Sequence, residues 1–135
     1  YEDTDLSGIV YHANYLRWFE RARSDVLRML EIDQRAAIEA GEGAYAVADV
    51  QMRYLRPALL DDDIVIHTRC SELKAASVRM VQEAKRDGET ICSATFRVGF
   101  VSPNGRPRRQ PEAWRHAFTR ILDTSSDTSS LGEHA

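Results

Sequence analysis

Residues 1–15 read YEDTDLSGIVYHANY and place two carboxylates and a glycine turn directly before a long amphipathic helix. We expect Asn14 to cap that helix, with Tyr11 as the alternative start. The first turn of a helix presents backbone N–H groups without intrahelical partners and about half a positive charge. A carboxylate beside such a turn offers a nucleophile or base next to a site that stabilises an oxyanion. This combination suits acyl transfer.

The residues that follow carry the periodicity of one helical face. Apolar side chains recur over residues 15–30 at spacings of three and four, which predicts a helix of about four turns. A short second helix is expected over residues 33–40, with Asp33 as its cap and Gly41 ending it.

After residue 43 the apolar pattern changes to alternation, which predicts four long antiparallel strands. Their expected ranges are about 46–54, 64–70, 75–85 and 90–102. Asp87-Gly88 is a hairpin turn, and Pro111 should open a final helix over residues 112–121. In the first strand one face is expected to hold Ala46, Ala48, Val50, Met52 and Tyr54.

One helix followed by four strands is an α+β pattern. We expect one domain over residues 1–121 and a disordered tail over residues 122–135, which is rich in Ser, Thr and Asp. A four-stranded sheet around one helix leaves a face and its edges uncovered, which dimerisation would cover.

Composition excludes several classes of function. The formal net charge of −3 argues against general nucleic-acid binding, and no apolar run is long enough to insert in a membrane. Two cysteines, Cys70 and Cys92, are too few for a disulfide framework and favour the cytoplasm. The four histidines show no metal-ligand spacing. Because the chain starts without Met at its richest motif, we expect a short segment to precede Tyr1.

The motifs together resemble the hotdog-fold acyl-CoA thioesterases, closest to the Tol-Pal-associated branch of the 4-hydroxybenzoyl-CoA thioesterase family. The resemblance spans residues 1–121, and its most specific part is the opening motif. The matching segments are residues 1–5 (YEDTD), 8–15 (GIVYHANY), 19–23 (FERAR), 54–58 (YLRPA) with 61–62 (DD), and 103–107 (PNGRP).

The resemblance implies an antiparallel sheet wrapped around one long central helix. It also implies that Asp5 is catalytic and that the backbone amide of His12, at the loop–helix junction, polarises the thioester carbonyl. No metal or organic cofactor is implied. Active sites of the family lie at a dimer interface, and dimers often pair into tetramers.

Each candidate residue also has a plainer structural interpretation. An ordinary Asp has a pKa of about 4, so Asp5 is expected to be ionised at neutral pH. As a carboxylate it would attack the thioester or activate water. The structural alternative is that Asp5 caps the turn. Asp3 is interpreted as part of a solvated turn. Gly8, Tyr11 and Asn14 are predicted to contact substrate, although shaping the turn would also explain Tyr11 and Asn14.

Arg106, Arg108 and Arg109 form the densest basic cluster of an acidic protein. Coenzyme A carries phosphates that favour arginine forks, so we predict that Arg106 and Arg108 bind CoA; the alternative is a solvated loop. The sequence therefore predicts a cytoplasmic homodimer or homotetramer that hydrolyses an acyl-CoA to free acid and CoA. The alternative is a hotdog scaffold or sensor that binds acyl-CoA without hydrolysing it.

Overall fold

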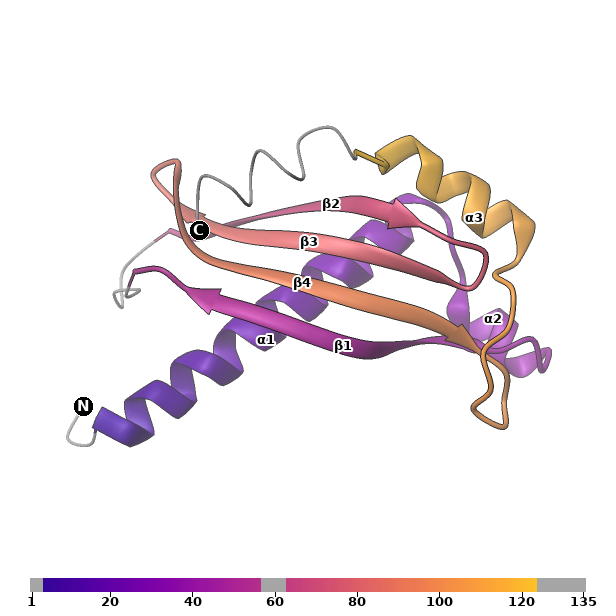
Figure 1. Ribbon diagram of the computed structural model, residues 1–135, viewed down its shortest axis with the longest axis horizontal. Coiled ribbons are helices and arrows are strands. Elements are labelled where there is room, and N and C mark those ends of the chain that lie inside the picture. The colour runs from indigo at the N-terminus through magenta and orange to yellow at the C-terminus, as the bar shows by residue number, and fades with distance from the viewer. Residues whose placement is uncertain (1–3, 57–62, 124–135) are drawn as a thin grey trace.

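The computed structural model describes residues 4–56 and 63–123, of which residues 4–13 are described by their backbone alone. One long helix precedes four antiparallel strands, which confirms the predicted α+β class (Figure 1). The elements are α1 (Thr4–Met29), α2 (Gln34–Glu39), β1 (Ala44–Tyr54), β2 (Val65–Leu73), β3 (Ser77–Arg86), β4 (Glu89–Val101), α3 (Glu112–Phe118) and the 3₁₀ turn η1 (Thr119–Ile121).

The four strands form one sheet in the order β1-β4-β3-β2, and every neighbouring pair is antiparallel. β3 and β4 are joined by the predicted hairpin turn, in which Asp87 (φ 53°) and Gly88 (φ 81°) both have positive φ. Two positive φ angles are typical of the type I′ turn that suits the twist of a hairpin. The first and second strands of the chain are thereby left at opposite edges of the sheet.

The long helix starts earlier than the sequence predicted. We expected its first turn near Asn14 or Tyr11, but α1 begins at Thr4. Between Thr4 and Met29 no proline interrupts the chain, and each added residue gains a hydrogen bond once a helix is nucleated. A single interior glycine, Gly8, costs about 1 kcal/mol relative to alanine, which is too little to end such a helix.

The inward face of β1 also differs from the prediction. A bulge shifts the register between Val47 and Asp49, so the strand changes face at Ala48. Tyr45 and Val47 therefore pair with Phe100 and Val98 of the buried face of β4, and Ala46 and Ala48 do not share the face of Val50. The predicted alternation is correct only after the bulge, at Val50, Met52 and Tyr54.

The core lies between α1 and the sheet face that it crosses (Figure 1). Phe19 is fully buried and its ring lies edge-on to that of Phe96, with 5.9 Å between the ring centroids. Burying a phenylalanine side chain contributes about 1.5–3 kcal/mol. The inward residues of β4 are all buried as predicted: Cys92, Ala94, Phe96, Val98 and Phe100.

α3 covers the same face of the sheet near the start of β1. Tyr45, Phe100, Trp114 and Phe118 pack edge-on or tilted, with centroids 5.4 to 6.0 Å apart. Beyond η1, the backbone N–H of Asp123 donates to the carbonyl of Cys70 at 2.7 Å, so the chain continues along the outer edge of β2. Within residues 4–56 and 63–123, no strand pairs with the outer edge of β1.

None of the helices among the described residues combines the length and the apolar character needed to cross a membrane.

Gly43 is predicted to be sensitive to substitution. Its φ is 135°, and a Cβ there would lie 2.2 Å from the carbonyl oxygen of Val101. Gly43→Ala is therefore expected to lower the free energy of unfolding by about 2–4 kcal/mol, measured by urea denaturation. Gly99→Ala is the control, because a Cβ there meets its nearest neighbour at 3.9 Å. Equal midpoints for the two variants would contradict this account.

Candidate active site

The predicted catalytic segment lies in the first turns of α1. Asp5, Gly8, Tyr11 and His12 all belong to this helix, and their side chains lie outside the description, as does the whole of Asp3. Asn14 is half-buried inside the helix and does not cap it.

The predicted loop–helix junction at His12 is wrong, because the helix starts at Thr4. In a regular α-helix the N–H of each residue bonds to the carbonyl four residues earlier, which for His12 is the carbonyl of Gly8. The amides without intrahelical partners belong instead to the first turn after Thr4, which contains Asp5.

The predicted basic cluster lies on the connection between β4 and α3. A tight turn builds this connection: the N–H of Ser102 donates to the carbonyl of Arg106, and the N–H of Gly105 donates to that of Ser102, both at 2.8 Å. The guanidinium of Arg108 donates to the carbonyls of Gly41 (3.3 Å) and Glu42 (2.6 Å). Arg108 thus ties this connection to the segment before β1.

Arg106 and Arg109 are exposed. Their side chains are therefore accessible to a charged ligand at the surface, whereas the guanidinium of Arg108 is already engaged by two backbone carbonyls.

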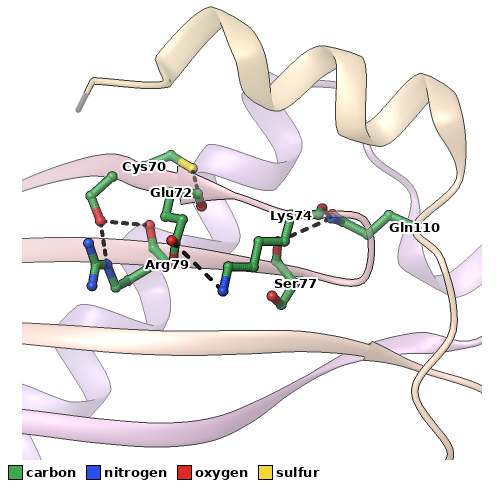
Figure 2. Close-up of polar contacts among 7 residues, drawn as sticks. Cys70, Glu72, Lys74, Ser77, Arg79 and Gln110 are labelled. Carbon is green, nitrogen blue, oxygen red and sulfur yellow. Dashed lines mark hydrogen bonds and ion pairs between the residues drawn. The ribbon is translucent and has the colours of Figure 1, made fainter.

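Gln110 holds the end of this connection against the sheet. It is buried, and its side-chain amide donates to the carbonyls of Lys74 (2.8 Å) and Ser77 (3.3 Å) at the turn between β2 and β3 (Figure 2). Its carbonyl accepts from the hydroxyl of Tyr45 at 2.6 Å. Burial raises the pKa of Tyr45 well above its usual range, so this hydroxyl stays a donor at neutral pH. The backbone that carries the arginines is thereby anchored.

Within one protomer the two predicted parts of the site are far apart. The ring of Tyr15 packs against that of Tyr54, at the end of β1, with 5.6 Å between centroids. Arg108 instead contacts Glu42, before the start of β1. Tyr45 and Tyr54 are separated by about 30 Å of extended strand. The N-terminal part of α1 extends beyond the end of β1 (Figure 1). A single protomer therefore does not bring Asp5 and the arginines together.

A groove runs between α1 and the inner face of β1. It consists of a cavity of about 430 Å³ and a deeper one of about 160 Å³, which share Glu20, Arg23 and Val47 as lining residues. The wider cavity is otherwise lined by Leu16, Arg17, Val50 and Phe96. We call these two cavities the α1–β1 groove. An apolar groove with a few polar groups is typical of small-molecule sites.

Arg23 lies at the point where the two cavities meet. Its guanidinium carbon is 3.9 Å from the centroid of the Phe96 ring, and its Nη1 donates to the side-chain carbonyl of Gln82 at 2.8 Å. The amide nitrogen of Gln82 donates in turn to the carbonyl of Phe19 (2.9 Å) and the hydroxyl of Thr68 (3.0 Å). Burial lowers the pKa of Arg23, and the nearby carboxylate of Glu20 opposes this shift.

The groove was not predicted from the sequence. The signal that could have revealed it is Gln82, which stands between Met80 and Ala84 on a strand face that is otherwise apolar. A fully buried glutamine needs partners for its amide, and Arg23 supplies one.

The two thiols are unsuited to nucleophilic catalysis at neutral pH. Burial raises the pKa of Cys70 to about 11 and that of Cys92 to about 12, so both stay protonated. Among residues 4–56 and 63–123, no cluster of three His, Cys, Asp or Glu side chains could hold a metal ion.

Comparison with known proteins places this arrangement among thioesterases. The sequence profile of the thioesterase-like superfamily matches residues 1–122. The acyl-CoA thioesterase YbgC of Haemophilus influenzae is 36% identical over 121 residues, which cover 86% of this chain and 89% of that protein.

Two solved structures share the architecture. The crystal structure of a "probable thioesterase" from Bartonella henselae superposes with a TM-score of 0.69 and 31% identity, over 75% of this chain and 84% of that one. A Thermus thermophilus thioesterase complexed with coenzyme A and Zn superposes with a TM-score of 0.67 and 28% identity, over 81% of this chain and 78% of that one.

Proposed function

The chain belongs to the thioesterase-like superfamily and has the hotdog fold, and from this premise we propose that it hydrolyses acyl-CoA thioesters to a free carboxylic acid and CoA. The observation that carries the proposal is the match along nearly the whole chain to a curated acyl-CoA thioesterase. Water is the second substrate, and the chemistry uses a carboxylate, a backbone amide and water, without a metal or organic cofactor. We place the protein in the cytoplasm, where its two free buried cysteines stay reduced.

Asp5 is the proposed catalytic carboxylate, and two routes use it. As a general base it takes a proton from water, whose oxygen attacks the thioester carbon; the tetrahedral oxyanion then expels the CoA thiolate. As a nucleophile its oxygen attacks that carbon and expels the thiolate, and water hydrolyses the resulting mixed anhydride. Label found in Asp5 after a single turnover in ¹⁸O-labelled water identifies the second route, because water that attacks the Asp5 carbonyl of the anhydride leaves its oxygen there and the general-base route never does.

The amide of His12 is the proposed oxyanion donor. Because α1 runs through this residue, the proposal requires that the helix unwind from its first residue as far as Tyr11 when substrate binds. Unwinding frees the N–H of His12 from the carbonyl of Gly8. Gly8 lowers the cost of that opening because glycine weakens a helix interior. Gly8, Tyr11 and Asn14 then line the opened segment beside the substrate.

A complete site is proposed to need two copies of the chain. The first turn of α1, which contains Asp5, and the β4–α3 connection lie at opposite ends of one protomer (Figure 1). The outer edge of β1 pairs with no other described strand. Exposed apolar side chains, Val47, Val50 and Tyr54, lie along the same strand. A second copy placed antiparallel along this edge would bring its arginines toward the Asp5 end, with CoA phosphates near Arg106 and Arg108. Two such dimers would form a tetramer.

Asp5→Asn is expected to lower kcat by about 10²–10⁴-fold, because the carboxylate is lost while the shape is kept. Thiol release from short aliphatic, long aliphatic and benzoyl-type CoA thioesters measures this. Asp25→Asn is the matched control, because it neutralises an exposed carboxylate on the same helix. Its turnover is expected to equal that of the wild type. Normal turnover in Asp5→Asn would contradict the mechanism. Binding without turnover by the wild type would favour the scaffold or sensor.

Gly8→Ala tests the opening of the helix. Alanine stabilises the helical form by about 1 kcal/mol, so the open form and kcat/KM are expected to fall about fivefold. Asp25→Ala raises helix propensity in a part of α1 that stays closed, and its kcat/KM should not change. Equal or higher activity in Gly8→Ala would show that helix opening is not required.

Arg106→Ala is expected to raise KM for acyl-CoA about three- to tenfold with little change in kcat, because a phosphate contact is lost. The corresponding acyl-pantetheine lacks the nucleotide and should show no change in KM. Arg120→Ala, at another exposed arginine, is the control. An equal effect on both thioesters would remove the phosphate contact from the proposal.

A further inference from the structure

The α1–β1 groove carries a net positive charge in a lining that is otherwise apolar or uncharged. Its charged lining residues are Arg17, Glu20 and Arg23, which sum to one positive charge at neutral pH. Arg17 and Glu20 are exposed, so water screens them, whereas Arg23 is half-buried between the helix and the sheet. The least screened charge in the groove is therefore a guanidinium.

The position of that guanidinium is set by groups around it. The amide of Gln82 is oriented by two donations, to the carbonyl of Phe19 and the hydroxyl of Thr68, which leaves its carbonyl oxygen facing Arg23. The ring of Phe96 supports the other side of the guanidinium through a cation–π contact. A side chain held in this way loses little conformational entropy when it binds a ligand.

Arg23 keeps donors for such a ligand. A guanidinium has five N–H donors, and the acceptor found for Arg23 among the described residues is the single neutral oxygen of Gln82. No carboxylate within this described part lies close enough to form an ion pair with it, since Glu20 acts on it only at longer range. A half-buried charge with a neutral partner is costly unless an anion joins it.

Resting on the proposed thioesterase activity, we propose that Arg23 determines substrate specificity by binding a carboxylate at the far end of the acyl group. Preferred substrates are then CoA thioesters of dicarboxylic acids, with their methylene chain against Leu16, Val50 and Phe96. A guanidinium binds a carboxylate through two parallel hydrogen bonds, which a terminal methyl group cannot form.

The distance along α1 decides which copy of the chain supplies the catalytic carboxylate. Asp5 and Arg23 are separated by about 27 Å at 1.5 Å per residue, which exceeds the length of a short dicarboxylic acyl group. The groove opens beside the exposed side chains of Val47 and Val50 on β1, the edge strand of the described sheet. The thioester bound by Arg23 of one protomer is therefore attacked by Asp5 of a second copy placed antiparallel along β1.

The test compares adipoyl-CoA with hexanoyl-CoA, which have the same chain length and differ in a terminal carboxylate or methyl group. The wild type is expected to have a kcat/KM at least tenfold higher for adipoyl-CoA. Arg23→Gln should lower kcat/KM for adipoyl-CoA about 10–100-fold and change that for hexanoyl-CoA less than about threefold. Arg21→Gln, exposed on the same helix outside the groove, should leave both values unchanged.

A binding measurement covers the case in which Arg23→Gln does not fold. The Asp5→Asn chain retains Arg23, and calorimetry should give it a Kd at least tenfold lower for adipoyl-CoA than for hexanoyl-CoA. Equal affinities, a wild-type preference for hexanoyl-CoA, or an equal loss on both substrates in Arg23→Gln would overturn the inference. Equal loss would mean that Arg23 binds a CoA phosphate. All three results leave the proposed hydrolysis standing, whereas absence of turnover on either substrate would contradict hydrolysis itself.

Discussion

The fold depends on the burial of one face of α1 against the sheet, centred on Phe19. Its ring packs on Phe96, and its backbone carbonyl accepts a hydrogen bond from the buried amide of Gln82. The first contact is apolar and tolerates sliding, whereas the second requires one position of the helix along the strands. Leaving the buried amide of Gln82 without this partner would lower the stability of the fold by about 1–3 kcal/mol. The hydrogen bond therefore fixes the position of α1 along the strands.

That register leaves the part of β1 around its bulge only partly covered by the helix. α1 crosses toward β2, and the inner side chains of β1 near its bulge, Val47 and Val50, remain 46% and 40% exposed. A groove opens between helix and strand for the same reason, and Arg23 reaches into it from the helix. The edge of β2, in contrast, is partly occupied by the chain after η1. The asymmetric packing of α1 thus produces the groove beside β1, whose outer edge pairs with no other strand among the described residues.

The opposite end of the molecule is organised by polar contacts. Gln110 and Arg108 bind backbone carbonyls of segments distant in sequence, and Gly43 lets the start of β1 approach the end of β4 closely. The connection that carries Arg106 is therefore well anchored, although it lies far from Asp5 in the same protomer. The catalytic carboxylate and the CoA contacts proposed for this chain lie at opposite ends of one protomer, and the proposed dimer would bring them together.

Four features could be predicted from the sequence alone: the α+β class, the hairpin at Asp87-Gly88, the cap at Asp33 and the buried face of β4. These features follow from local conformational preferences and from side-chain periodicity, which act over a few residues. The opening motif likewise identified the family. Helix length was misjudged because the interior Gly8 and Asn14 look like boundary residues, although one glycine costs less than a growing helix gains.

Long-range packing determines the inward face of β1, the groove and the role of Gln82. A bulge at Ala48 depends on pairing with β4, and a single extra residue reverses every earlier side chain of the strand. Arg23 and Gln82 are far apart in the chain and meet only when helix and sheet pack. Their contact depends on burial and on the direction in which α1 crosses the strands, and neither is encoded by local sequence periodicity.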